Sequence, residues 1–141
     1  MAMIVEEIMT SNVATCTADA TLKQVAQQMI DYDCGEIPVV ESSTSKQIVG
    51  VITDRDITVR AVAKGIGPNE GTVKDCMSKG VHTVTRETTV EDVMDLMESK
   101  QIRRVPVVDA NGNICGIVAQ ADVAKHVNDD RVGDVVKEVS R

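Results

Sequence analysis

Aromatic side chains are almost absent from this sequence. Among 141 residues there is no Phe and no Trp, and Tyr32 is the single Tyr. Basic residues are outnumbered too, with 15 Lys and Arg against 22 Asp and Glu, which gives a net charge of −7. Nucleic-acid binding generally requires clustered basic side chains, and single strands also require aromatic platforms for stacking. We therefore expect no nucleic acid among the partners.

Long apolar segments are also lacking. No run of 18 apolar residues occurs, so the sequence predicts no membrane-spanning helix and no membrane partner. The first residues, MAMIVEEIMT, lack the basic region and the long apolar stretch of a signal peptide. These two features lead us to expect a cytoplasmic protein.

Paired cysteines are missing as well. The four cysteines, Cys16, Cys34, Cys76 and Cys115, form no C-x-x-C pair, so we expect no metal site. Free cysteine is often buried, and the sequence therefore predicts reduced, mostly buried thiols.

The most informative feature that is present is an internal repeat. VEEIMT at residues 5–10 matches VKDCMS at residues 73–78, and the match continues at an offset of 68 residues through IPVV and VPVV. After a loop that is two residues longer in the first copy, the offset becomes 66, so that Asp56 aligns with Asp122. The chain therefore consists of two copies of a unit of roughly 60 residues, each too small for an independent core.

Both copies predict the same order of elements. A short strand (13–15, 81–83) precedes a helix, and the helix starts fit capping boxes of Thr21 with Gln24 and of Thr88 with Glu91. A strand containing Pro follows (36–40, 104–108), and Pro suggests a strand start or an edge strand. A turn, marked by Asn-Gly at 111–112, leads to a second apolar strand and a second helix, which in the first copy ends near Gly65.

These elements define the expected domain organisation. We expect a first repeat at residues 3–64, a linker at 65–71, a second repeat at 72–128 and a tail at 129–141. The fold class is α/β (α+β): each repeat is a small sheet with two helices, and the repeats pack sheet against sheet with pseudo-two-fold symmetry. In the tail, four Val residues at helical spacing indicate a short helix, either docked on the body or part of an oligomer contact.

The repeat, the two x-h-P-V-V strands and the G-h-x-T-x-x-D junction at residues 50–56 resemble a pair of CBS domains, the Bateman module. The resemblance covers residues 3–128, and ITDRDI at 52–57 is especially similar to stand-alone bacterial CBS-pair proteins of the hypoxic response protein group. It implies a regulatory sensor without catalytic activity. Members bind adenosine-containing ligands such as AMP, ADP, ATP, NAD or S-adenosylmethionine in two clefts between the repeats, and they commonly form dimers.

The resemblance also implies which residues form the clefts, since each cleft takes its junction from one repeat and its adenine slot from the other. Asp56 is expected to bind the ribose diol, and Arg55, Arg103 and Arg104 to bind phosphate. The full set expected for this first cleft is Thr53, Arg55, Asp56, Val81, His82, Thr85, Ile102, Arg103, Arg104 and Val105.

The second cleft departs from the family's pattern. Ala119 replaces the junction Thr, Ala121 stands where the first copy has Arg55, and Gly35 with Glu36 replaces the Arg pair. The residues expected to bind a ligand there are Thr17, Cys34, Gly35, Ile37 and Asp122. Because cations are lost and a carboxylate is gained, we expect phosphate to bind more weakly in the second cleft.

Other interpretations of the same residues remain open. Thr53 and Asp56 also fit a helix N-cap, which is compatible with ligand binding because a helix N-terminus is itself an anion site. The favoured function is a homodimeric sensor of an adenosine nucleotide, AMP or ATP in the first place, that has no cofactor and acts on an unknown protein target. The alternatives are an adaptor with empty clefts and, less favoured, a small enzyme using Asp54, Asp56 and His82.

Overall fold

The computed structural model describes residues 2–130, of which residues 127–130 are described as backbone alone. The predicted tail helix with its four Val residues falls on residues 131–141, outside the described part. No helix of the described part is long and apolar enough to cross a membrane.

The first repeat forms a three-stranded sheet against which helix side chains pack. Its elements are β1 (Cys16–Thr17), α1 (Leu22–Asp31), β2 (Glu36–Val40), β3 (Ile48–Thr53), α2 (Asp54–Arg60) and the 3-10 turn η2 (Val62–Lys64). The strand order is β1-β2-β3, with β1 parallel and β3 antiparallel to β2. The strand predicted at residues 13–15 is therefore wrong by position, since pairing begins only at Cys16, opposite Val39.

The second repeat has the same hairpin and the same pair of helices. Its elements are α4 (Val90–Lys100), β4 (Arg104–Val108), β5 (Ile114–Ala119) and α5 (Gln120–Asp130), and β4 and β5 form an antiparallel sheet. The strand predicted at residues 81–83 is not formed. A single parallel bridge between Val84 and Val107 takes its place, because the chain meets β4 one residue later and only at this point.

The helix starts and ends follow local side-chain chemistry. Thr21 and Gln24 form the predicted capping box, in which the Thr21 hydroxyl accepts from the Gln24 N–H at 3.1 Å. The prediction for the second copy is wrong by one residue, because the N-cap is Thr89, whose hydroxyl accepts from the Asp92 N–H at 3.1 Å. The Thr88 hydroxyl accepts instead from the backbone N–H of Thr85. Gly65, with φ +76°, ends η2 and confirms the predicted stop.

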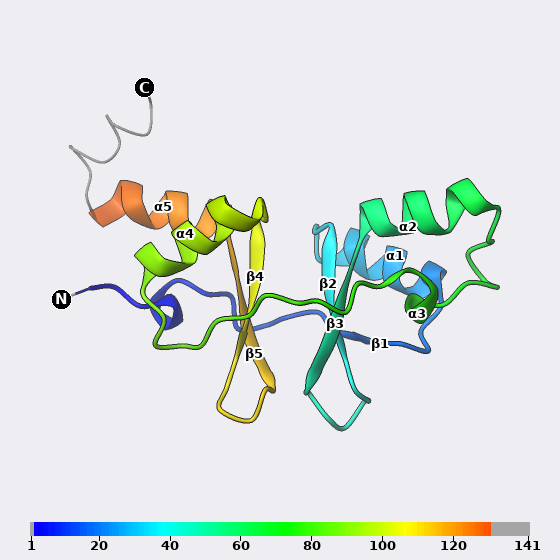
Figure 1. The fold of residues 1–141 in the computed structure, drawn as a ribbon, viewed down its shortest axis with the longest axis horizontal. Coiled ribbons are helices and arrows are strands. Elements are labelled where there is room, and N and C mark those ends of the chain that lie inside the picture. Colours follow the sequence, from blue (N-terminus) through cyan, green and yellow to red (C-terminus); the bar gives the residue numbers. More distant parts are fainter. Residues whose placement is uncertain (1, 131–141) are drawn as a thin grey trace.

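The first segments of the two repeats exchange places. The turn η1 (Val5–Glu7) lies against the second repeat, where the Val5 N–H donates to the Thr88 carbonyl at 2.7 Å. The helix α3 (Val73–Cys76) lies against the first repeat, where the Val73 N–H donates to the Ala20 carbonyl at 2.9 Å. In Figure 1 the blue N-terminal segment and the green segment after α3 cross between the two halves in opposite directions. The fold of each repeat is therefore completed by the first segment of the other.

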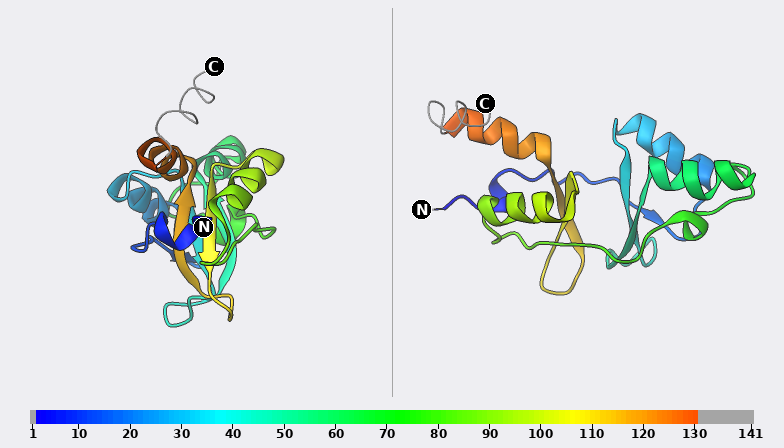
Figure 2. Two further views of the ribbon diagram at one scale, coloured as in Figure 1. Left: turned by 90° about the vertical axis from the view of Figure 1, so that its left-hand side faces the viewer. Right: turned by 45° about the horizontal axis from the view of Figure 1, so that its top comes forward.

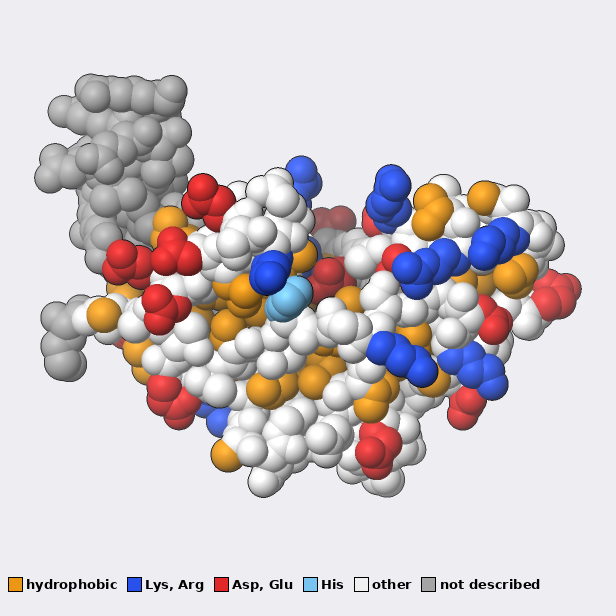
Figure 3. Space-filling model, in the orientation of Figure 1, with side chains coloured by type: hydrophobic (Ala, Val, Ile, Leu, Met, Phe, Trp, Pro, Cys, Tyr) orange, Lys and Arg blue, Asp and Glu red, His pale blue; other side chains and the backbone are white. Residues whose placement is uncertain are grey.

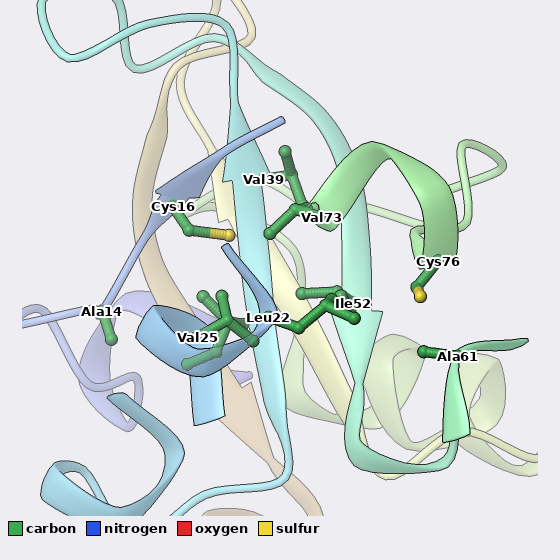
Figure 4. Packing of buried hydrophobic residues seen from close by; sticks show 10 residues of the cluster. Ala14, Cys16, Leu22, Val25, Val39, Ile52, Ala61, Val73 and Cys76 are labelled. Atoms are coloured by element: carbon green, nitrogen blue, oxygen red, sulfur yellow. The ribbon is translucent and has the colours of Figure 1, made fainter. Parts of the chain in front are cut away.

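This exchange also divides the buried side chains into two cores. One core contains Ile37 and Ile52 of the first repeat together with Val73 and Cys76 of α3, and Figure 4 shows these two α3 side chains pointing into the cluster. The second core contains Val5 of η1 among the side chains of α4, α5, β4 and β5. Because each core includes a residue from the exchanged segment, neither repeat buries its apolar face alone.

The two hairpins meet at their turns. The Ile48 N–H donates to the Gly112 carbonyl at 3.2 Å, and the Ile114 N–H donates to the Lys46 carbonyl at 2.9 Å. Gly112 adopts φ +83° in the turn predicted from Asn-Gly. Figures 1 and 2 show these turns at one end of the hairpins and the helices α2 and α5 at the other. The strand-to-helix junctions of both repeats therefore lie at the same end of the molecule, and the expected α/β fold of two repeats is confirmed.

The crossing segments leave no room for a side chain at Gly50. A Cβ there would lie 2.7 Å from the Ser78 carbonyl oxygen, and Ser78 bridges with Val51. We expect Gly50→Ala to lower the free energy of unfolding by about 1–3 kcal/mol, because the backbone of the crossing segment must move. Gly80→Ala is the control, since a Cβ there meets nothing within 4 Å. Urea unfolding of the two variants measures the difference, and equal stability would contradict the close approach.

Candidate functional site

The junction of the first repeat is a complete capping box. The Thr53 hydroxyl accepts from the Asp56 N–H at 3.0 Å, and Asp56 Oδ2 accepts from the Thr53 N–H at 3.0 Å. Arg55 is exposed, and Asp56 is half-buried. The capping interpretation of the sequence is therefore confirmed, and the second carboxylate oxygen of Asp56 makes no hydrogen bond with a described residue.

The junction of the second repeat keeps only half of this arrangement. Asp122 Oδ2 accepts from the Ala119 N–H at 2.9 Å. Ala119 has no hydroxyl that could accept from the Asp122 N–H, as Thr53 does from Asp56 in the first repeat. Asp122 lies in the first turn of α5 and is half-buried. Its Oδ1 atom has no hydrogen-bond partner among the described residues, so one carboxylate oxygen remains for a ligand.

A cavity of about 260 Å³ opens at this second junction. Its walls come from both repeats: the residues after α1, the start of β2, the start of β4, and the end of β5 with the first turn of α5. The segment at residues 10–14 closes the remaining side. The lining residues are Thr10, Asn12, Val13, Ala14, Tyr32, Cys34, Glu36, Pro38, Arg104, Ile117, Ala119, Ala121 and Asp122.

The cavity brings together part of the predicted second cleft. Cys34 and Asp122 both line it. The other three predicted residues do not: Thr17 pairs with Val40 in the sheet, the Gly35 carbonyl accepts from the Asp54 N–H at 2.9 Å, and Ile37 is fully buried in the first core.

Of the residues predicted for the first cleft, Arg104 lines this same cavity. Val105 is fully buried in the second core, and Ile102 packs against that core. His82, Thr85 and Arg103 are exposed, and Val81 is half-buried. Thr53, Arg55 and Asp56 stay together at the first junction, on the other side of the paired hairpins.

Several lining residues were missing from the sequence prediction. Val13 and Ala14 align with Val81 and His82 at the offset of 68, whereas Glu36 was already expected at this cleft in place of Arg104. Applying the repeat equally to both clefts would therefore have found Val13 and Ala14. Tyr32 aligns with a lysine, so the repeat carries no signal for it.

The electrostatics of the cavity centre on Glu36. Burial raises the pKa of the Glu36 carboxyl from 4.5 to about 7, while Arg104 acts to lower this pKa and Asp56 to raise it. The influence of Asp56 is explained by the sheet, because Glu36 pairs with Thr53, the residue that caps α2 with Asp56. Glu36 therefore lies within the fields of both junctions.

The thiols are arranged differently from a metal site. Cys16 and Cys76 are buried in the first core, and burial raises the pKa of Cys16 to about 12, so this thiol stays protonated. Among the side chains described, no three His, Cys, Asp or Glu residues gather closely enough to hold a metal ion.

Comparison with known proteins identifies the family. The model of the CBS domain matches residues 5–62 and 73–129. The CBS domain-containing protein YhcV of Bacillus subtilis is 36% identical over 137 residues, covering 96% of this chain and 94% of that protein.

Two solved structures are similar over nearly the whole fold. The crystal structure of Hypoxic Response Protein I with two coordinated zinc ions has a TM-score of 0.78 and 31% identity, covering 87% of this chain and 98% of that one. The CBS domain pair of protein MJ0100, in complex with 5′-methylthioadenosine and S-adenosyl-L-methionine, has a TM-score of 0.80 and 26% identity, covering 92% and 98%. The chain therefore belongs to the CBS-domain family, as a protein with two consecutive CBS repeats.

Proposed function

We propose that this chain senses an adenosine-containing ligand in the clefts between its two repeats and transmits occupancy to a protein target. The observation that carries the proposal is the cavity that both repeats line, with the Asp122 carboxylate at its edge. One oxygen of this carboxylate is held by the Ala119 N–H, which orients the other. A carboxylate oriented in this way can accept hydrogen bonds from the two hydroxyls of a ribose.

The composition of the cavity suits a nucleoside. Val13, Pro38 and Ile117 provide apolar surface for a flat base, and Asp122 and Arg104 provide polar groups on the same cavity wall. Small-ligand sites commonly combine apolar walls with a few polar groups that fix orientation. The related pair of MJ0100, solved with two adenosyl compounds, supports the choice of an adenosyl ligand.

The same chemistry is proposed for the first cleft. Asp56 occupies the position equivalent to Asp122, and its Oδ2 accepts from the Thr53 N–H as Asp122 Oδ2 accepts from the Ala119 N–H. Thr53 also has the hydroxyl that Ala119 lacks, and this hydroxyl accepts from the Asp56 N–H. Arg55 follows on the first turn of α2, where an anion is favoured by the helix N-terminus. Binding in either cleft would hold the repeats together and shift the population of conformations that a target recognises.

Ligand binding has a direct test. We expect adenosine or AMP at millimolar concentration to raise the melting temperature of the protein, because a ligand that binds only the folded state stabilises it. Mass spectrometry after incubation should recover the ligand intact. Consumption of the nucleotide would favour the enzyme alternative, and an unchanged melting temperature with every adenosyl compound tested would favour the adaptor.

A homodimer is the second part of the proposal. Large apolar side chains are exposed on the helices, among them Ile30 of α1 at 72% and Val62 of η2 at 67%. On the face shown in Figure 3, acidic side chains gather over α4 and basic side chains over α2 and α3, so two copies offer complementary charge. We expect multi-angle light scattering at micromolar concentration to give twice the mass of 15.2 kDa. A monomer mass with and without nucleotide would contradict the dimer.

A further inference from the structure

Glu36 and Arg104 occupy equivalent positions in the two repeats. They align at the offset of 68, and each is the first residue of its strand. Each also pairs with the last residue of the second strand of its own repeat, Glu36 with Thr53 and Arg104 with Ala119. Despite coming from different repeats, both line the same cavity. At these two equivalent positions, one repeat therefore carries an acidic side chain and the other a basic one, whereas two identical repeats would carry the same side chain twice.

Neither side chain is neutralised by a close partner. Between the described residues the structure contains one ion pair, in which Arg86 Nε and Glu6 Oε2 are 3.5 Å apart. Glu36 and Arg104 therefore lie more than 4.0 Å from each other's charged atoms. No hydrogen bond from a described residue reaches either side chain. Both remain available to a molecule in the cavity.

Charges of both signs surround Glu36, and Arg104 affects the pKa of its carboxyl more than Asp56 does. Asp122 lies across the cavity, at the start of α5, and Asp54 lies beside the neighbouring Gly35, since a Cβ on Gly35 would meet Asp54 Oδ2 at 2.9 Å. Tyr32 and Cys34, which follow α1, are the uncharged titratable groups on the wall. Among the described side chains, the charged groups on the elements packed around Glu36 are Lys23 and Asp31 of α1, Asp54, Arg55, Asp56 and Arg60 of α2, Arg104 of β4, and Asp122 and Lys125 of α5, which also carries the titratable His126.

From this arrangement we propose that Glu36 selects the ligand of this cavity by charge. With Glu36 ionised, the cavity takes an adenosyl ligand whose 5′ substituent is neutral or cationic. With Glu36 protonated, it also takes a phosphate. The proposal rests on the adenosyl ligand proposed above and assigns a ligand class to the second cleft.

Counting the charges on the cavity wall gives the direction of the effect. When Glu36 is ionised, two carboxylates, Glu36 and Asp122, face one guanidinium, so a phosphate dianion meets net repulsion and a cation meets net attraction. When Glu36 holds its proton, its hydroxyl can donate to a phosphate oxygen, and Arg104 becomes a guanidinium that only Asp122 offsets. The pKa of Glu36, raised by burial to about 7, places the change between these states near neutral pH.

The proposal is tested by calorimetric titration at pH 6 and pH 8 with three probes that differ only at the 5′ position: adenosine, AMP and 5′-amino-5′-deoxyadenosine. For the wild type at pH 8, we expect AMP to bind the Asp122 cavity at least tenfold more weakly than adenosine, and the amine to bind more tightly than adenosine. At pH 6 the AMP deficit should shrink. All titrations, including those of the reference protein with Glu36 intact, are made in the Asp56→Asn background, so that the first cleft contributes little. Because the Asp56 charge also raises the pKa of Glu36, proteins are compared only within this background.

Glu36→Gln isolates the effect of the carboxylate. In this variant AMP should bind at pH 8 at least tenfold more tightly than to the wild type, with adenosine unchanged. The phosphate of AMP titrates near pH 6, and this contribution stays in the variant, so only the difference between the proteins is assigned to Glu36. Glu41→Gln is the matched control, since Glu41 follows the other end of β2 and is exposed. An AMP-to-adenosine ratio that is unchanged by Glu36→Gln overturns the proposal.

Two further measurements keep the outcome decisive. If Glu36→Gln does not fold, Arg104→Gln replaces it and should weaken AMP at pH 6 at least tenfold, with adenosine unaffected; an unchanged AMP affinity overturns the proposal. If adenosine binds no form of the protein, the proposed function fails. Inorganic phosphate then tests charge selection independently of adenosine. If Glu36 repels phosphate, phosphate should raise the melting temperature of Glu36→Gln at pH 8 more than that of the wild type. An equal response to phosphate overturns charge selection as well.

Discussion

Asp122→Asn is expected to weaken adenosine binding at the cavity by about 1.5–3 kcal/mol, the range for a hydrogen bond to a charged group. Asn keeps the size of the side chain, and its carbonyl oxygen can still accept from the Ala119 N–H, which now binds Asp122 Oδ2 at 2.9 Å. The atom that faces the ligand changes from an acceptor to an amide donor, so a ribose diol loses one acceptor. Isothermal titration calorimetry with adenosine measures the loss.

Asp56→Asn is the matched comparison, because the repeat places this carboxylate in the same position at the first junction. The two variants should reduce binding at different sites, so that the double variant loses both. An Asp122→Asn protein that is folded, as judged by its circular dichroism, and binds adenosine with unchanged affinity and stoichiometry would show that the carboxylate does not bind the ribose.

The repeat made the fold predictable to a large extent. Alignment of Asp56 with Asp122 and of IPVV with VPVV was sufficient for two units with the same order of elements. Local chemistry was equally readable, since Thr21 and Gln24, and Thr53 and Asp56, form boxes within four consecutive residues. Local patterns were therefore interpreted correctly in the first repeat, while in the second the predicted helix start at Thr88 was wrong by one residue, since Thr89 is the N-cap.

Features that depend on contacts across the chain were missed. The exchange of η1 and α3 is invisible in the sequence, because Val5 and Val73 have the same local surroundings whichever core they enter. The strand at residues 81–83 was predicted from its composition, yet strand pairing requires a partner, and β4 meets only Val84. Arg104 was assigned to the first cleft alone for the same reason. The repeat fixes its place in β4, but only the packing of the hairpins shows that it also faces Asp122.

The contribution of Glu36 to the stability of the protein should fall as the pH rises from 4.5 to 7. Burial raises the pKa of this carboxyl from 4.5 to about 7 in the folded state, so the folded protein holds the proton more tightly than the unfolded chain. The stabilisation by this proton is fully present below pH 4.5 and is lost as the pH rises through 7. Glu36→Gln removes the ionisation. The difference in free energy of unfolding between the variant and the wild type should therefore be roughly 2 kcal/mol more favourable to the variant at pH 8 than at pH 4.5. A shift of one pKa unit corresponds to about 1.36 kcal/mol, and the expected value is set lower than the full shift would give because the Glu36 carboxyl is partly exposed.

Urea unfolding of both proteins without ligand, at intervals between pH 4.5 and pH 8, measures this difference. Other groups titrate over the range as well. Their contributions cancel when the variant is compared with the wild type at each pH, since they are the same in both proteins. Glu41→Gln should follow the wild type at every pH, because Glu41 is exposed. A Glu36→Gln curve parallel to the wild type would mean that Glu36 is ionised in the folded protein at pH 5, and the same result would remove the proton on which selection of phosphate near neutral pH depends.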